Sequence, residues 1–448
     1  MKKAVGAFFS LYLATLVLLV GSGLFNTFMG VDLTARNVSE TWVGAMIAAY
    51  YLGLVFGARH SHKLTITVGH IRAYSASAAI ATVAILAQVL VDNLWVWLVL
   101  RFGAGLAMVT QFVVLESWLN EQTENESRGV VFAFYMVVSG VGTVLGQLSL
   151  TLFGEVRHEP LVFVAMCFVL SLVPVTLTRR IHPALQVPAP LAFRYYLARV
   201  PLSMTVLFIA GLITGAFYGL APVYALKQGL DSGQVAVYLA VSVAAGLIAQ
   251  WPLGWLADRM SRVLMIRLNA LLLLLLGIPL WGWLVFPFWV LLAFSSLLGA
   301  LQFTLYPLGT AFANDNVEPE RRVGLSAIVY MLYGLGACLG PLAAGLLMRY
   351  YDSGVYFIFV SACSLVLVAV VRQKKVKGDH VSQDAPTQYV PMPESPQSSA
   401  VVASLDPRVD AEADKSHELP TEEEIALDSS PDADSPAPAD APVRAAMQ

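Results

Sequence analysis

The chain has 448 residues, of which 57% are hydrophobic and only 13% are charged. Soluble domains carry roughly 25% charged residues, so this composition excludes an ordinary soluble protein and predicts one that is solvated by lipid. The net charge of −3 combines a basic body with an acidic C-terminal tail, and no basic stripe interleaved with aromatic residues indicates nucleic-acid binding.

Apolar runs recur from the N-terminus onwards, each near the roughly 20 residues that a helix needs to cross the hydrocarbon core. The first run follows Met1-Lys2-Lys3, is too long for a signal peptide and lacks a cleavage site, so we interpret it as a retained span. The runs are continuous and not alternating, which argues against a β-barrel. The predicted spans are residues 6–30, 41–59, 73–92, 94–117, 129–153, 160–178, 201–226, 233–257, 264–284, 286–313, 323–349 and 353–371.

Lys and Arg are distributed unevenly among the loops between these spans. With the N-terminus inside, most of them fall on cytoplasmic loops, as Arg59, Lys63 and Arg72 do after the second span. Positive residues accumulate on the cytoplasmic side of membrane proteins. Twelve spans with both termini in the cytoplasm are therefore predicted.

A proline-containing polar stretch divides the spans six and six. We predict an N-terminal six-helix bundle at residues 1–180, a cytoplasmic linker at 181–200 and a C-terminal six-helix bundle at 201–375. Residues 376–448 are rich in Ser, Pro, Ala, Asp and Glu and cannot bury enough apolar surface to fold, so a disordered acidic cytoplasmic tail is predicted.

The two halves repeat each other at an offset of 194 residues. Glu126-Ser127-Arg128 then coincides with Glu320-Arg321-Arg322, and a G-x-G-x3-G pattern recurs in the following span of each half. In the second half this pattern continues into Gly340-Pro341, which predicts close helix packing and a bend. Parallel six-helix repeats are typical of one large transporter architecture.

The most specific pattern lies between the eighth and ninth predicted spans. It reads G-x-x-x-D-R-x-x-R and is formed by Gly254, Asp258, Arg259 and Arg262. This loop resembles the loop motif of the major facilitator superfamily, and with Gly57-Ala58-Arg59-His60 it looks like the YcaD-like branch of bacterial facilitators. The resemblance covers roughly residues 5–375. It implies the major facilitator fold, an all-α membrane protein of two six-helix bundles in a bacterial inner membrane.

We predict a cytoplasmic gate around this loop. Gly254 permits close helix approach, and Asp258 can lie against the N-terminus of a helix in the other half. The two arginines can pair with carboxylates such as Glu121 or with lipid phosphates. The alternative is that these charges only set the topology. The remaining predicted gate residues are Glu121, Asp315, Arg128 and Arg322. The loop after the second span lacks the aspartate, so we expect an asymmetric gate.

Arg101 lies within the fourth predicted span. A buried Arg in lipid costs at least about 2.5–3.5 kcal/mol, so it is expected to face a central pathway or an ion partner. Asp32, at the outer end of the first span, is the candidate partner. The alternative is an Arg101 side chain that reaches the membrane interface.

Glu116, near the inner end of the same span, is the candidate carboxylate for proton coupling, with a gate ion pair as the alternative. Other polar side chains are costly in lipid and are predicted to line the substrate and proton pathway, although each could instead satisfy a neighbouring helix. They are Asn26, Gln111, Gln147, Tyr218, Tyr224, Gln302 and Tyr306. The scarcity of fixed charges indicates a neutral or amphipathic substrate.

These patterns favour a secondary active transporter that moves a small solute by proton-coupled alternating access. A uniporter of the same fold and a non-transporting membrane scaffold remain alternatives, while a membrane enzyme would need larger outer loops. The three cysteines lie in apolar runs without paired spacing, and no metal-binding pattern is present, so neither a cofactor nor a metal is expected. Expected partners are the solute, protons and membrane lipids, with a monomeric chain.

Overall fold

The computed structural model describes residues 8–123, 127–154, 158–178, 193–318 and 321–371, together with Tyr389, Ser398, Ser399 and Val401. Within these residues the regular structure is helical and contains no strand. Eleven of the described helices are long and apolar enough to cross a membrane, and a shorter apolar helix, Val355–Val370, completes the series. The prediction of an all-α membrane protein is confirmed.

Each predicted span has its helix. The first six are α2 (Phe9–Ala35), α3 (Glu40–Val68), α4 (His70–Leu90), α5 (Leu94–Gln122), α6 (Arg128–Ser149) and α7 (Glu159–Leu177). The second six are α9 (Pro201–Lys227), α10 (Ser232–Ala257), α11 (Arg262–Gly277), α12 (Phe288–Asp315), α13 (Arg322–Tyr350) and α14 (Val355–Val370). Two short 3₁₀ turns, Leu150–Leu152 and Ile278–Leu280, extend α6 and α11.

The outer surface of the helices is apolar. On α4, for example, Ile80, Val83 and Leu86 are exposed, whereas a water-facing helix would place polar residues there. Extensive exposed apolar area marks a surface that contacts another apolar phase, and here that phase is the hydrocarbon of the bilayer.

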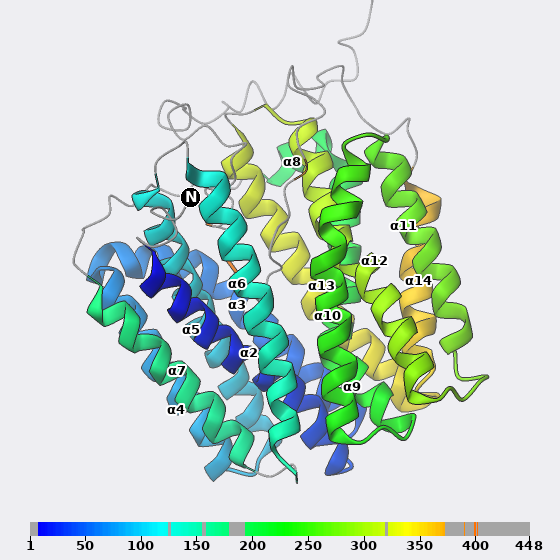
Figure 1. Cartoon of the computed structure of the whole chain (residues 1–448), viewed down its shortest axis with the longest axis horizontal. Helices are drawn as coiled ribbons and strands as arrows, with labels where there is room; N and C mark the ends of the chain where they lie inside the picture. The colour runs from blue at the N-terminus through cyan, green and yellow to red at the C-terminus, as the bar shows by residue number, and fades with distance from the viewer. Residues whose placement is uncertain are drawn as a thin grey trace, which may run out of the picture.

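The internal repeat is visible in the helix boundaries. α5 and α12 begin at Leu94 and Phe288, and α6 and α13 begin at Arg128 and Arg322, so both pairs keep the offset of 194 residues. Figure 1 shows α2 to α7 on one side of the molecule and α9 to α14 on the other. Within the first group α2 packs against α6 and α7, and within the second α9 packs against α13 and α14.

The two groups meet mainly where α3 packs against α13 and α9, α6 against α10, and α2 against α9. Close packing around α13 depends on the predicted glycine pattern. A Cβ atom added at Gly340 would lie 2.1 Å from the carbonyl oxygen of Leu212 on α9, so only glycine lets these two backbones touch.

A short helix that the sequence did not predict, α8 (Phe193–Arg199), lies in the linker at one end of the helices (Figure 1). The Tyr196 hydroxyl donates to the carbonyl oxygen of Arg321 (2.9 Å), and the Arg321 guanidinium lies 4.6 Å from the centre of the Tyr195 ring. Burial raises the pKa of the Tyr195 hydroxyl above its ordinary value, so the ring stays neutral beside the cation. We call this end of the molecule the α8 end, and the other the opposite end.

Candidate substrate pathway between the helix groups

Helix α5 carries a line of buried polar side chains. Arg101, Gln111 and Glu116 are all 0% exposed, and at 100° per residue they fall on one side of the helix. With a rise of 1.5 Å per residue, Arg101 and Glu116 lie about 22 Å apart along the axis. The helix thus presents one cation toward the opposite end and one carboxylate toward the α8 end.

Arg101 is enclosed by side chains of the first helix group. Its Nη2 atom donates to Oδ1 of Asn26 (3.1 Å), and its guanidinium lies 4.0 Å from the ring centre of Phe25 and 5.1 Å from that of Tyr50. Its Nε and Nη1 atoms have no hydrogen-bond partner among the residues that the structure describes. The side chain is wholly inside the protein, which excludes the alternative of an Arg101 that reaches the membrane interface.

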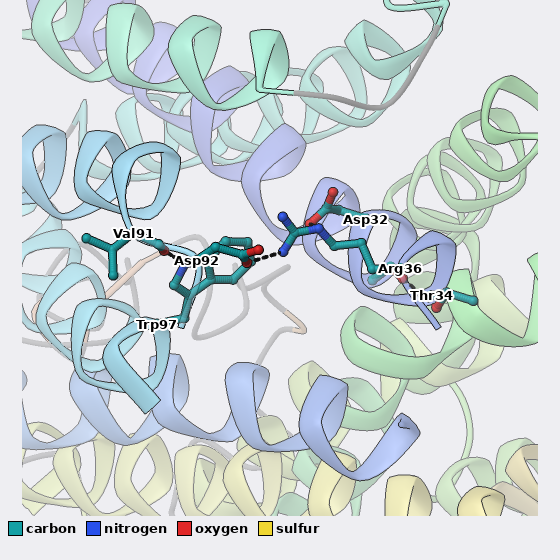
Figure 2. A network of polar contacts seen from close by, with 7 residues as sticks. Asp32, Thr34, Arg36, Val91, Asp92 and Trp97 are labelled. Carbon is teal, nitrogen blue, oxygen red and sulfur yellow. Dashed lines mark hydrogen bonds and ion pairs between the residues drawn. The ribbon is translucent and has the colours of Figure 1, made fainter. Parts of the chain in front are cut away.

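Asp32 does not serve as the ion partner of Arg101. It forms an ion pair with Arg36 at 3.7 Å, and Arg36 also reaches Asp92 at 2.9 Å (Figure 2). The Arg36 guanidinium lies 5.2 Å from the ring centre of Trp97. The predicted pairing is wrong because Arg36 stands one helical turn from Asp32, where two side chains on a helix meet directly. The network instead ties the end of α2 to the connection between α4 and α5.

Glu116 is surrounded by hydrogen-bond donors. The Tyr135 hydroxyl on α6 donates to its Oε1 atom (2.7 Å). The backbone N–H of Ser399 lies 3.0 Å and 3.1 Å from the two carboxylate oxygens, and the Ser399 hydroxyl also bonds to Oε2. The neighbouring carbonyl of Ser398 accepts from the Tyr330 hydroxyl on α13 (3.4 Å). A dipeptide from the tail therefore lies between the two helix groups.

Sequence reasoning missed Tyr135 and Tyr330, the two hydroxyl groups that complete this cluster. Each is at most 4% exposed, and the predicted pathway took tyrosines from the seventh and tenth spans but none from the fifth or eleventh. The two residues come from opposite helix groups. Polar aromatic residues within predicted spans were the signal that could have found them.

The other predicted pathway residues are buried glutamines and tyrosines. Gln111 and Gln147 are buried, and each has an Oε1 atom without a hydrogen-bond partner among the described residues. On α12, Gln302 is buried and the Tyr306 ring lies 4.7 Å from that of Tyr333 on α13.

Two pathway tyrosines pack in aromatic clusters of the second helix group. Tyr218 lies against Phe303, with 6.2 Å between ring centres. Tyr224 lies against Tyr356 and Phe357 of α14, at 6.1 Å and 4.8 Å. These contacts place Tyr224 with the core of its own group and not beside the polar side chains of α5.

Three gate residues form an ion-pair cluster within the second group, with Arg262 and Asp315 buried and Asp258 exposed. Nε of Arg262 lies 2.5 Å from Oδ2 of Asp315, and Nη2 lies 3.5 Å from Oδ1 of Asp258. The predicted partner Glu121 instead keeps a buried Oε2 atom with no hydrogen-bond partner among the described residues. The cluster joins α10, α11 and α12 and does not bridge the two groups in this conformation.

Arg259, the other arginine of the loop motif, packs on an aromatic ring. Arg259 turns back onto Trp255, donating to its carbonyl oxygen (3.2 Å) with the guanidinium 3.8 Å from the ring centre. Because Trp255 is exposed, this pair suits the membrane interface. Arg128 and Arg322 are buried at the equivalent first positions of α6 and α13.

Gly254 and Asp258 both contact Tyr389 of the tail. The backbone N–H of Tyr389 donates to Oδ1 of Asp258 (2.8 Å). A Cβ atom added at Gly254 would lie 2.2 Å from Cδ1 of the Tyr389 ring. Most of the tail predicted to be disordered lies outside the described residues, but Tyr389, Ser398 and Ser399 are buried and depart from the expectation of a solvated segment.

At the opposite end the two groups touch directly. Lys227 on α9 forms an ion pair with Glu40 on α3. A Cβ atom added at Gly44 would lie 2.2 Å from the carbonyl oxygen of Pro341, and the Cys338 thiol lies 3.5 Å from the carbonyl oxygen of Ala48. Tail residues occupy the interface at the α8 end, whereas backbone-to-backbone contact closes it here.

The sequence profile of the Major Facilitator Superfamily matches residues 11–286 and 270–405. The chain belongs to the Major Facilitator Superfamily. An uncharacterised transporter of this superfamily from Enterobacter sp. (strain 638) is 30% identical over 371 residues, 82% of this chain and 94% of that one. The YcaD transporter of Salmonella typhimurium (strain LT2) is 29% identical over 359 residues, 80% of this chain and 92% of that one. The predicted YcaD-like resemblance is confirmed.

Solved structures of major facilitators share the fold. The nucleoside transporter NupG superposes with a TM-score of 0.70 at 14% identity, over 81% of this chain and 97% of that one. A bacterial homologue of the human lysosomal transporter Spinster, inward-facing and occupied, superposes with a TM-score of 0.63 at 14% identity, over 81% and 94%. This major facilitator is thus a multi-pass integral membrane protein and a membrane transporter.

Proposed function

We propose that the protein is a secondary active transporter that moves a small polar solute across a bacterial inner membrane by alternating access, with Glu116 binding both solute and proton. The observation that carries this proposal is the wholly buried carboxylate of Glu116, which lies where the two helix groups meet and holds an N–H and an O–H group of Ser399. A solute with amine, amide or hydroxyl donors presents the same chemistry.

The α8 end is the cytoplasmic end in this proposal. Arg72 and Arg259 lie in or beside the connections at that end, in keeping with the accumulation of positive residues on cytoplasmic loops. The direct contacts at the opposite end then correspond to closure toward the periplasm. The conformation described is one in which the Glu116 site faces the cytoplasmic end, where the tail residues lie.

Competition at one carboxylate provides the coupling. An ionised Glu116 offers acceptor lone pairs to the donors of the solute, whereas a protonated Glu116 has given part of that capacity to the proton. Burying a carboxylate charge is costly, and a proton or the donors of a solute lower that cost, so the helix groups reorient only when Glu116 carries either solute or proton. This gives exchange of a proton for a solute molecule.

Arg101 supplies the opposite chemistry nearer the periplasmic end. Two of its nitrogen atoms lack hydrogen-bond partners among the described residues, and a buried guanidinium remains charged at neutral pH. Since about 22 Å of helix separates it from Glu116, a small solute cannot bind both at once. Arg101 therefore binds acceptor oxygens of the solute at a second station along the pathway.

The test uses the purified full chain in proteoliposomes with an imposed pH gradient and a panel of neutral and amine-bearing solutes. We expect gradient-driven flux of at least one solute, and a loss of its pH dependence in Glu116→Gln. The matched control is Glu159→Gln, because Glu159 is an exposed carboxylate at the start of α7. Equal pH dependence in Glu116→Gln and the unaltered protein would overturn the proposal, and flux without any gradient dependence would indicate a uniporter.

A further inference from the structure

We infer that the segment containing Tyr389, Ser398, Ser399 and Val401 is an intramolecular ligand of the Glu116 site, which blocks solute access from the α8 end until it is released. The inference rests on the proposed function in taking Glu116 as the solute site. The docking of the segment is a physical claim that stands without it.

The first anchor is the Ser398-Ser399 dipeptide. Ser398 and Ser399 are 2% and 1% exposed, and between them they contact Glu116 of one helix group and Tyr330 of the other. The Ser399 hydroxyl also accepts from the backbone N–H of Val401 (3.2 Å). Hydrogen bonds to a charged partner are stronger than those between neutral groups, so these contacts identify a specific binding site.

The second anchor is Tyr389. Its ring occupies the space beside Gly254, and its backbone N–H satisfies Asp258, the acidic residue of the loop motif. Tyr389 is 7% exposed. The same carboxylate lies beside Arg262, so the tail is attached to the ion-pair cluster that connects α10, α11 and α12.

The composition of the segment suits these acidic partners. Between Ala385 and Leu405 the sequence contains a single charged residue, Glu394, although the tail around it is strongly acidic. An acidic segment would be repelled by Glu116 and Asp258, whereas an uncharged one offers backbone N–H groups and serine hydroxyls. Covalent attachment adds an effective concentration on the order of millimolar, so even weak intrinsic affinity keeps the site occupied.

Occupancy by the tail and by solute are mutually exclusive. The N–H and O–H groups of Ser399 use both oxygens of Glu116, which leaves a solute donor no place without displacing the segment. The protein therefore transports only while the segment is undocked from Glu116. A change that weakens either anchor therefore raises the fraction of time the site is free.

Hydrogen exchange of the full chain in nanodiscs tests the docking without any solute. The amides of Tyr389, Ser399 and Val401 donate hydrogen bonds, so peptides containing them should exchange at least about tenfold more slowly than unprotected peptides of the same tail. Asp258→Ala should speed exchange at Tyr389, and Glu116→Ala should speed exchange at Ser399. Uniformly fast exchange from residue 376 onward would overturn the docking, whether or not the protein transports.

Cysteine alkylation tests the blocking. In a chain with Cys167, Cys338 and Cys363 changed to Ala, the variant Tyr330→Cys places a thiol beside Ser398. Adding Ser399→Asp places a second carboxylate against that of Glu116, and the two repel each other. The segment should then leave the site more often, and N-ethylmaleimide should alkylate the introduced thiol about tenfold faster. Ser395→Asp is the matched control, with the same charge four residues away. Equal alkylation rates in the Ser399→Asp and Ser395→Asp chains would overturn the blocking role.

Discussion

The two ends of the interface between the helix groups are closed by different means. At the opposite end the groups themselves meet, with Lys227 paired to Glu40 and the backbones of α3 and α13 in contact at Gly44 and Pro341. At the α8 end the acidic residues Glu116 and Asp258 receive their donors from the tail. One closure belongs to the rigid helices, and the other to a segment that can leave.

This difference explains why the loop motif lies only in the second helix group. In that group Asp258 and Asp315 surround Arg262 on three helices, and the same Asp258 holds Tyr389. After the second span, the equivalent loop has no aspartate and so offers no carboxylate to a tail. The ion-pair cluster is both a support for its own group and the platform on which the segment docks.

The largest expected effect comes from breaking that platform. Arg262→Met removes the cation between Asp258 and Asp315 and leaves both carboxylates without it, and breaking a buried ion pair in this way costs about 3–5 kcal/mol. Thermal unfolding of the purified protein should shift to a markedly lower midpoint, and Tyr389 should lose protection from hydrogen exchange.

The matched control for this change is Arg259→Met in the same loop. Arg259 contacts the exposed Trp255, and exposed cation–π pairs contribute about 0.5–1 kcal/mol. A second variant that combines Arg262→Met with Asp315→Leu should recover part of the lost stability, because it removes one of the stranded charges. Equal unfolding midpoints for Arg262→Met and Arg259→Met would show that the cluster is not what supports the α8 end.

The closure at the opposite end should respond to Gly44→Val. The added side chain cannot fit 2.2 Å from the carbonyl oxygen of Pro341, and overpacking of this kind costs about 1–3 kcal/mol. Because this cost applies only while the two groups are in contact, the fraction of molecules with the opposite end closed should fall. In a chain that keeps Cys338 and has Cys167 and Cys363 changed to Ala, alkylation of Cys338 should accelerate about fivefold or more, since 1.4 kcal/mol corresponds to a factor of ten.

Gly103→Val is the control for that experiment. Gly103 lies on α5, and a Cβ atom built there meets nothing within 4 Å. Both variants add the same side chain to a membrane helix, so the difference between them isolates the contact between the two groups. If Cys338 reacted at the same rate in both, the contact at Pro341 would not hold the opposite end closed.

The membrane-spanning helices could be predicted from the sequence. The span helices follow from apolar length, because a lipid solvent forces every backbone polar group into a helix. The predicted spans 286–313 and 323–349 agree with α12 and α13 to within two residues at each end. The short helix α8 was missed because seven residues, Phe193–Arg199, are too few to show a helical period.

The site was harder to predict because its contacts join segments far apart in the chain. The pairing of Asp32 with Arg101 ignored the nearer cation Arg36, which spacing on one helix could have revealed. The role of Ser399 could not be inferred from composition, because the argument for disorder concerns a segment that must bury its own surface. It does not apply to a segment that docks on a carboxylate the rest of the protein has already buried.

The smallest expected effect concerns the edge of the opposite end. Asp92→Asn removes one charge partner of Arg36 (Figure 2), but the Asp92 side chain is 79% exposed, and exposed ion pairs contribute about 0.2–1 kcal/mol. Asp32→Asn, whose side chain is 10% exposed in its contact with Arg36, should cost more. Thermal unfolding at low and high salt separates the two, because salt screens the exposed pair with Asp92 more strongly than the buried one. A larger loss from Asp92→Asn than from Asp32→Asn would mean that the surface pair, and not the buried carboxylate, holds the end of α2 in place.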